Sequence, residues 1–264
     1  MQCAGYLLLP LFTYALLLTS CEKVIDVDLN SASPKYVIEG NIADGPGPHY
    51  VRITQTKSFD EDNTFNGIDN AVVTISDNSG NTEVLNPSGD GVYKTTALAG
   101  IPGRTYSLTV RIDGETNTAA AAMPVLESFD SLYIEESVIF GDTIKTITIR
   151  FRDNSSTRNF YRHLLYVNNS RIPAIFIGAD EGNDGAQLIR TLSYSNENGA
   201  LKPGDTVKVE VQSIPEEVYT YFSSLDQTIS LAAATPANPI SNISGGALGY
   251  FSTHSAETKT IVLD

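Results

Sequence analysis

Residues 71–85 read "AVVTISDNSGNTEVL" and hold two short strand-like segments around a polar centre. In the first segment Val73 and Ile75 alternate with polar side chains, a period of two that is typical of a half-buried strand. The centre, Asp77–Asn81, consists of glycine and the small polar residues that turns favour. The stretch therefore predicts a β-hairpin with one apolar face.

Alternating segments and turn signals continue on both sides of this hairpin, at the spacing expected of an all-β sandwich. Residues 90–110, "DGVYKTTALAGIPGRTYSLTV", resemble Ig-like and transthyretin-like modules, in which an extended segment follows a Pro-Gly turn. We therefore expect a mainly β fold. Its first domain, residues 33–124, is expected to be an Ig-like or transthyretin-like β-sandwich.

Strands resume after Met123-Pro124, which we interpret as the boundary of a second β-rich domain over residues 125–264. Within it, residues 204–214, "GDTVKVEVQSI", alternate as a strand does. The apolar residues that follow have helical spacing: Val218, Tyr221, Phe222 and Leu225. This change of period predicts one substantial helix near residues 215–231, with Ser213 as its N-cap.

Near the N-terminus lies a run of 13 uncharged, mostly apolar residues, Tyr6 to Leu18, whereas a membrane-spanning helix needs about 20. A run of this length predicts a signal peptide over residues 1–20. Leu18-Thr19-Ser20-Cys21 then resembles the lipobox of bacterial lipoproteins, which implies that Cys21 is lipidated and that Cys3 is removed with the signal. The alternative is an ordinary secretory signal followed by a coincidental cysteine.

Residues 21–32 predict a short tether and a first strand, because Ile25, Val27 and Leu29 alternate with aspartates. The acyl chains of a lipoprotein together give stable anchoring, so the body is expected to lie close to the membrane. The acidic residues that soon follow the cysteine resemble a signal that exports some lipoproteins to the cell surface. We expect an outer-membrane, surface-exposed protein, and a periplasmic location remains the alternative.

The charge balance argues against one class of partner. The chain has 31 acidic and 17 basic residues and a net charge of -14, so its surface repels phosphate backbones. No nucleic-acid partner is therefore expected. The sequence also lacks the G-x-S-x-G, P-loop and G-x-G-x-x-G motifs, and its three histidines have no metal-ligand spacing. We expect no catalytic residues, no metal and no cofactor, although a hydrolase that uses paired carboxylates stays open.

Two acidic loops offer oxygen ligands of the kind that calcium prefers. They are residues 59–70, "FDEDNTFNGIDN", and residues 178–186, "GADEGNDGA". Neither has the order of ligands that an EF-hand requires. We favour the interpretation that both are solvated surface loops, and the calcium interpretation remains open.

The run from Gln227 to Ala256 contains no Asp, Glu, Lys or Arg, in a chain that is 18% charged. Several prolines and glycines are expected to interrupt any long element there. One interpretation is a loop that packs on the core, with Tyr250 and Phe251 as packing residues. The other is an exposed contact surface for a protein partner, with Tyr250 or Phe251 as its anchor.

Several stretches together resemble a family of Bacteroidetes-type outer-membrane lipoproteins that is known only as a domain of unknown function. They are "VIDVDLNSASPKYVIEGNI", "AVVTISDNSGNTEVL", "GVYKTTALAGIPGRTYSLTV", "LKPGDTVKVEVQSIPEEVYTYFSSL" and "PANPISNISGGALGYFS". Such proteins are often encoded beside TonB-dependent receptors. The resemblance implies a non-catalytic accessory or ligand-binding role in nutrient uptake, with such a receptor as partner. A structural or adhesive surface protein is the alternative, and the sequence does not identify a ligand.

Overall fold

A computed structural model gives the fold of most of the chain from residue 33 onward. The described residues are 33–57, 61–62, 64–126, 129–139, 142–152, 158–180, 185, 187–194, 200–230 and 237–264. Of these residues 56% lie in strands and 7% in a helix, which confirms the predicted mainly β fold. The signal peptide, Cys21 and the strand expected at residues 25–29 lie outside the described residues.

The first sandwich packs two sheets around one apolar core. One sheet has the order β10-β9-β4-β5 and is antiparallel, and the facing strands are β1, β3, β7 and β6, joined by part of β18. Their bounds are β1 (Tyr36–Ala43), β3 (Tyr50–Gln55), β4 (Val72–Asp77), β5 (Thr82–Val84), β6 (Asn86–Pro87), β7 (Val92–Lys94), β9 (Thr105–Ile112), β10 (Glu115–Ala122) and β18 (Leu248–Val262). A separate short pair, β2 (Gly45–Pro46) and β8 (Ala99–Gly100), accompanies them. The hairpin predicted over residues 71–85 is the pair β4-β5, and β9 and β10 form a second hairpin.

The core of this sandwich is built by the alternation seen in the sequence. The side chains that point inward are apolar and fully or almost fully buried, among them Ile38, Ile53, Val73, Tyr106, Leu108 and Phe251. Phe251 belongs to the range 125–264, which we had assigned to the second domain. The C-terminal segment therefore completes the core of residues 33–124.

A second sandwich places the antiparallel sheet β11-β12-β16 against strands β13, β17 and the later part of β18. The bounds are β11 (Phe129–Ile139), β12 (Asp142–Arg152), β13 (Phe160–Val167), β14 (Ser170–Arg171), β15 (Phe176–Ala179), β16 (Gln187–Leu192) and β17 (Thr206–Ile214). Its core includes Ile147, Phe151, Leu165, Val209 and Leu263. The short strands β14 and β15 pair with β13.

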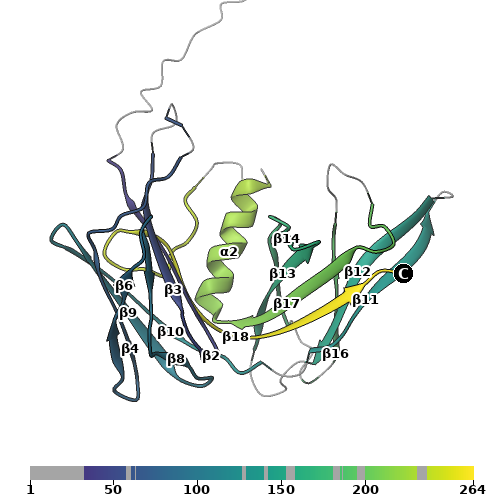
Figure 1. The fold of residues 1–264 in the computed structure, drawn as a ribbon, viewed down its shortest axis with the longest axis horizontal. Coiled ribbons are helices and arrows are strands. Elements are labelled where there is room, and N and C mark those ends of the chain that lie inside the picture. Colours follow the sequence, from purple (N-terminus) through teal and green to yellow (C-terminus); the bar gives the residue numbers. More distant parts are fainter. Residues whose placement is uncertain are drawn as a thin grey trace, which may run out of the picture. The chain divides into compact units, whose positions relative to one another are not determined.

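Strand β18 is common to both sandwiches (Figure 1, yellow). Residues 248–254 pair with β1 in parallel, and residues 255–262 pair with β17 antiparallel. One sheet therefore runs through the order β14-β13-β17-β18-β1-β3-β7-β6. We expected Gly249 to interrupt any long element, but it lies inside this 15-residue strand. Residues 249–255 are buried on both faces, so they lack the polar alternation that marks a half-exposed strand.

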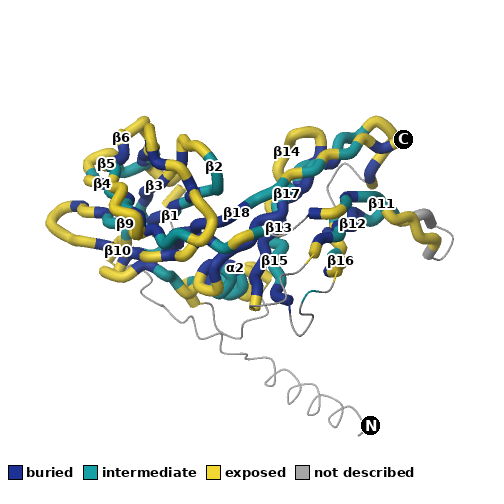
Figure 2. The backbone as a smooth tube through the Cα atoms, turned by 90° about the horizontal axis from the view of Figure 1, so that it is seen from below, coloured by how far each residue is buried: buried dark blue, intermediate teal, exposed yellow. Residues whose placement is uncertain are grey.

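Helix α2 (Glu216–Ile229) confirms the helix predicted near residues 215–231. The predicted N-cap is wrong: Pro215 occupies that position, and Ser213 is a buried residue of β17. The apolar face of the helix, with Val218, Tyr221 and Phe222, packs with side chains of β13, β15, β17 and β18. Buried residues follow these strands beside the helix (Figure 2). The candidate site lies between this helix and the sheet.

Candidate ligand pocket

Tyr250 and Phe251, the two candidate contact residues, point to opposite faces of the sheet. Phe251 is 0% exposed and belongs to the first core, where the backbone of Gly40 leaves room for its ring. Tyr250 is 7% exposed and faces helix α2, with its ring centre 4.9 Å from that of Tyr221 and 4.9 Å from that of Phe222. Both positions fit the interpretation as packing residues. Neither offers a free aromatic surface.

A row of polar side chains crosses the sheet face that Tyr250 shares. Alternation along β18 places Ser252 and His254 on this face, because residues two apart in a strand point the same way. The neighbouring strand β1 adds Glu39 and Asn41, which lie opposite Tyr250 and Ser252 in the register. The Asn41 side chain donates a hydrogen bond of 3.2 Å to the Tyr250 hydroxyl. This face of the sheet is thus polar, although much of it is buried.

His254 is held in one tautomer by its two neighbours on this face. The Gln212 amide nitrogen lies 2.6 Å from a Glu210 carboxylate oxygen and 3.2 Å from His254 Nε2. An amide nitrogen only donates, so His254 Nε2 accepts and the ring proton lies on Nδ1, 3.2 Å from the Ser252 hydroxyl. Burial, together with the charges of Arg162 and His49, lowers the pKa of His254 to about 3. The imidazole is therefore neutral at physiological pH.

Arg162 on β13 carries the buried positive charge of this face. Its side chain is opposite Gln212 in the register, and the residue is only 9% exposed. The guanidinium carbon lies 3.8 Å from the centre of the Phe222 ring, which is a cation–π contact with helix α2. Burial, helped by the charge of Arg171, lowers the pKa of Arg162, whereas the hydrogen-bonded Tyr250 and the charge of Glu210 oppose that shift. Within the described residues no carboxylate forms an ion pair with Arg162.

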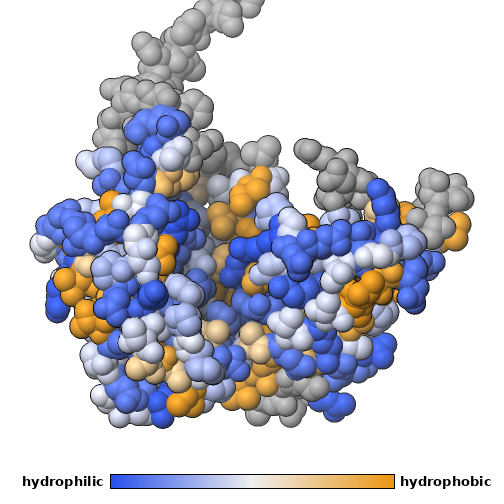
Figure 3. All heavy atoms as spheres, in the orientation of Figure 1, coloured by the Kyte–Doolittle hydropathy of each residue, from blue (hydrophilic) through white to orange (hydrophobic). Residues whose placement is uncertain are grey.

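These side chains line a cavity of about 220 Å³ between helix α2 and the sheet. Its charged and aromatic lining consists of Glu39, Arg162, Arg171, Tyr221, Phe222 and Tyr250, and its apolar lining includes Pro173, Ile175, Leu225 and Ile229. Apolar side chains show at the surface where the helix lies (Figure 3). A concave site with apolar walls and a few convergent polar groups is the usual form of a small-molecule site. We call this cavity the α2 pocket.

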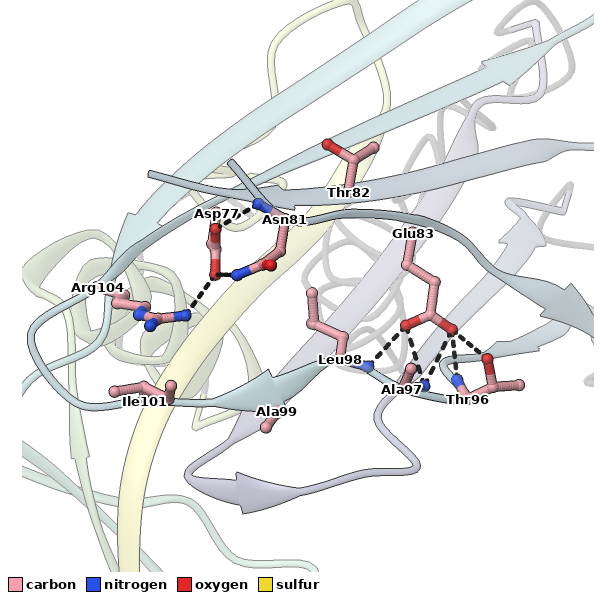
Figure 4. A pocket seen from close by; sticks show the side chains of 10 residues that line it. All are labelled: Asp77, Asn81, Thr82, Glu83, Thr96, Ala97, Leu98, Ala99, Ile101 and Arg104. Carbon is pink, nitrogen blue, oxygen red and sulfur yellow. Dashed lines mark hydrogen bonds and ion pairs between the residues drawn. The ribbon is translucent and has the colours of Figure 1, made fainter. Parts of the chain in front are cut away.

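A second cavity, of about 430 Å³, lies in the first sandwich between β5 and the loop that follows β7. The Glu83 side chain reaches across it to that loop (Figure 4). Its carboxylate accepts backbone hydrogen bonds from Ala97 and Leu98, the latter at 2.7 Å, and a hydroxyl hydrogen bond from Thr96 at 2.7 Å. Burial raises the pKa of Glu83, but these hydrogen bonds outweigh it and leave the pKa lowered. Glu83 therefore acts as a structural brace.

Asp77, the other acid of this cavity, is engaged in the same way (Figure 4). It accepts hydrogen bonds from the side chain of Asn81 and the backbone of Ser79, and it forms an ion pair of 2.8 Å with Arg104. The hydrogen bond from Asn81 is the largest of several that hold the pKa of Asp77 at about 2. Both carboxylates already have protein partners. The charged groups of the larger cavity are therefore less available to bind a ligand than those of the α2 pocket.

The two acidic loops are described in part. Of the two acidic loops, residues 59–60, 63, 181–184 and 186 lie outside the described residues, so the calcium interpretation of each loop stays a prediction. Within the described ranges, no three His, Cys, Asp or Glu residues are grouped so that they could hold a metal ion. No helix of the described part is long and apolar enough to cross a bilayer.

Sequence reasoning identified Tyr250 but missed Arg162. Arg162 lies in the stretch "FYRHLLYV", residues 160–167, which forms β13. A signal was present, because a charged residue stands among apolar neighbours in a strand that is buried on both faces. What the sequence could not supply was the partner helix: Phe222 lies sixty residues further along the chain.

Comparison with known proteins adds the family. No curated protein matches the chain. A family model described as "Domain of unknown function (DUF4249)" matches residues 22–260, which is nearly all of the chain that follows the predicted signal peptide. This confirms the part of the resemblance that concerned an uncharacterised family. Because the match covers far more than half of the sequence, the chain belongs to the DUF4249 family.

Proposed function

We propose that this protein is a non-catalytic, lipid-anchored lipoprotein of the outer membrane that binds a small ligand beside a TonB-dependent receptor. The observation that carries the binding role is the α2 pocket, in which Arg162 is buried against Phe222 and, among the described residues, forms no direct ion pair with a carboxylate. A pocket that contains a buried cation without a direct ion pair is better suited to holding a ligand than to filling a core. The receptor would receive the ligand for uptake.

The membrane anchor is supported by the sequence alone. The run Tyr6–Leu18 is too short to span a bilayer and is followed at once by Leu18-Thr19-Ser20-Cys21. Lipidation of Cys21 would attach two or three acyl chains, which together hold a protein stably on a membrane. The first described strand, β1, begins at Tyr36, so few residues separate the anchor from the folded body.

The carboxylates of the larger cavity favour a binding role over the hydrolase alternative. Glycosidases need two carboxyl groups that are free to exchange protons with substrate. Glu83 and Asp77 are instead saturated by hydrogen bonds from the protein, and their pKa values are lowered. A general acid needs a raised pKa.

Cell fractionation tests the anchor. The full-length wild-type chain is expected in the outer-membrane fraction, and Cys21→Ala is expected to leave it, because the lipid is the proposed attachment. Cys3→Ala is the matched control and should fractionate like wild type, since residues 1–20 are removed. If Cys21→Ala stays with the membrane as strongly as wild type, the anchor proposal fails. Affinity purification from solubilised outer membranes should also recover a TonB-dependent receptor, and its absence would argue against the uptake role.

A further inference from the structure

We propose that the α2 pocket binds a small organic anion with one carboxylate group, which Arg162 holds while the ligand's apolar body lies against helix α2. This inference rests on the binding role proposed above and names the chemistry of the ligand. It is carried by the charges, stacking contacts and apolar walls of the pocket.

The charge of Arg162 is the first step. Burying a charged group is costly unless it is paired and hydrogen-bonded. Arg162 is 9% exposed and is hydrogen-bonded to Tyr250. The negative charge of Glu210 is felt at the guanidinium, and Glu39 lines the same pocket, but among the described residues neither carboxylate forms an ion pair with Arg162. A guanidinium has five N–H donors, and its fork matches the two oxygens of a carboxylate. A bound carboxylate would give Arg162 the direct ion pair that these residues do not provide.

The contact with Phe222 is the second step. The guanidinium carbon lies 3.8 Å from the ring centre, so one side of Arg162 is covered by the aromatic ring. Stacking leaves the edge of a guanidinium, where its donors lie, free for hydrogen bonds. The side chain is thereby held in position before any ligand arrives, which lowers the entropy cost of binding.

The other polar groups of the pocket determine how many negative charges the ligand can carry. Arg171 adds a second positive charge to the lining, and Glu39 adds a negative one. The lining therefore favours one negative charge over two. Burial and the nearby Glu39 raise the pKa of Tyr221 to about 12, so its hydroxyl keeps its proton and can donate to a carboxylate.

The remaining walls define the ligand's body. Ile175, Leu225 and Ile229 are aliphatic, and Tyr221 and Tyr250 add two aromatic rings whose centres lie 4.9 Å apart. The volume of about 220 Å³ is below the about 300–1,000 Å³ of sites for drug-sized ligands. A monocarboxylate with a single aromatic ring or a short aliphatic chain fits both the chemistry and the size.

Calorimetry of the detergent-solubilised full chain tests this with two matched probes. 3-Phenylpropionate carries the carboxylate, and 3-phenylpropanamide has nearly the same shape without the charge. We expect the carboxylate to bind at least about tenfold more tightly than the amide. Arg162→Met should abolish this preference, and Arg162→Lys should keep part of it. The control is Arg158→Met: Arg158 also stacks on a phenylalanine, 5.0 Å from the Phe160 ring centre, but it does not line the pocket, and its removal should change neither affinity.

Each outcome decides the proposal. Equal binding of the two probes, or a preference that survives in Arg162→Met, would overturn carboxylate recognition while leaving a ligand-binding pocket in place. If neither probe binds, the inference is wrong. The proposed membrane role is tested separately, by fractionation of Cys21→Ala and by co-purification of the receptor. If Arg162→Met does not fold, Arg171→Met provides the test, because Arg171 is exposed on β14. Loss of Arg171 should weaken binding of the carboxylate probe and leave binding of the amide probe unchanged. Unchanged binding of both probes would count against the proposal.

Discussion

Consecutive residues can have separate roles when a strand is buried on both faces. Phe251 fills the first core, while Tyr250 on the opposite face lines the α2 pocket. Substituting either residue should therefore affect a different property: the stability of the sandwich for Phe251, and the shape of the pocket for Tyr250.

Phe251→Ala is expected to reduce the free energy of unfolding by about 3–5 kcal/mol, because a large side chain leaves a cavity in a packed core. Phe65→Ala is the matched control: Phe65 is 48% exposed, so its loss should change stability by less than about 0.5 kcal/mol. Urea unfolding of the two variants measures both values. If the two variants were equally stable, Phe251 would not be the core residue described here.

At the scale of elements, the pairing of β1 with β18 depends on one glycine. Gly249 has a φ of +103°, and a Cβ atom there would lie 2.0 Å from the carbonyl oxygen of Ile38. A side chain at this position would clash with the backbone of β1. The two strands can approach as they do only because residue 249 has none.

Gly249→Ala should therefore destabilise the protein more than Gly246→Ala does. Gly246 has the same φ of +103°, but a Cβ atom there would meet nothing within 4 Å. Both variants carry the backbone strain of an alanine at positive φ, about 1–2 kcal/mol, and only Gly249→Ala adds the clash. Hydrogen exchange should show faster exchange of the β1 amides in Gly249→Ala alone. Similar exchange in both variants would mean that the close approach is not limiting.

Local signals in the sequence predicted the elements whose partners are near in the chain. The β4-β5 hairpin followed from its turn residues, and helix α2 followed from the spacing of Val218, Tyr221 and Phe222. The first half of β18 was not predicted as a strand. It has no polar alternation, and its partner β1 lies at the other end of the described chain. No local pattern reports such a long-range parallel pairing.

The sequence indicated single residues of the α2 pocket but not how they come together. The absence of charge between Gln227 and Ala256 directed attention to Tyr250. Among the described residues of this run only 249–255 are buried on both faces, and burial explains the absence of charge there alone. The α2 pocket combines residues of β1, β13, β14, α2 and β18. Their convergence depends on the order of strands in the sheet, which alternation does not determine. Arg162 could be recognised as unusual from its neighbours, but its partners could not.

At the scale of the whole molecule, buried histidines couple stability to pH. His163 lies in the second core, and within the described residues neither ring nitrogen has a hydrogen-bond partner. Burial, assisted by the charge of Arg190, lowers its pKa to about 3, as burial does for His254. An unfolded histidine has a pKa of about 6.5. Between pH 6.5 and 3 the unfolded chain therefore takes up protons that the folded protein does not.

Acidification is thus expected to lower the free energy of unfolding. When the pH falls from 7 to 4.5, each of the two histidines should lower the free energy of unfolding by about 2–3 kcal/mol. This stability should be recovered as the pH rises above 6.5. His163→Leu should remove its share of the acid sensitivity while keeping stability at pH 7, because the ring has no hydrogen bonds to lose. Chemical unfolding at several pH values measures this. An unchanged pH profile for His163→Leu would show that His163 is not a source of the effect.

Strand β18 also sets the time at which the protein can fold. It follows, in the chain, every strand with which it pairs, so a growing polypeptide exposes β1 and β17 without their common neighbour until residues 248–262 have been made. Contacts between such distant segments form slowly, because a long loop must close first. Neither core can be completed on the ribosome before synthesis reaches this strand. Until then the polypeptide stays incompletely folded. A chain in that state can pass through a secretion channel, as an exported protein would have to do.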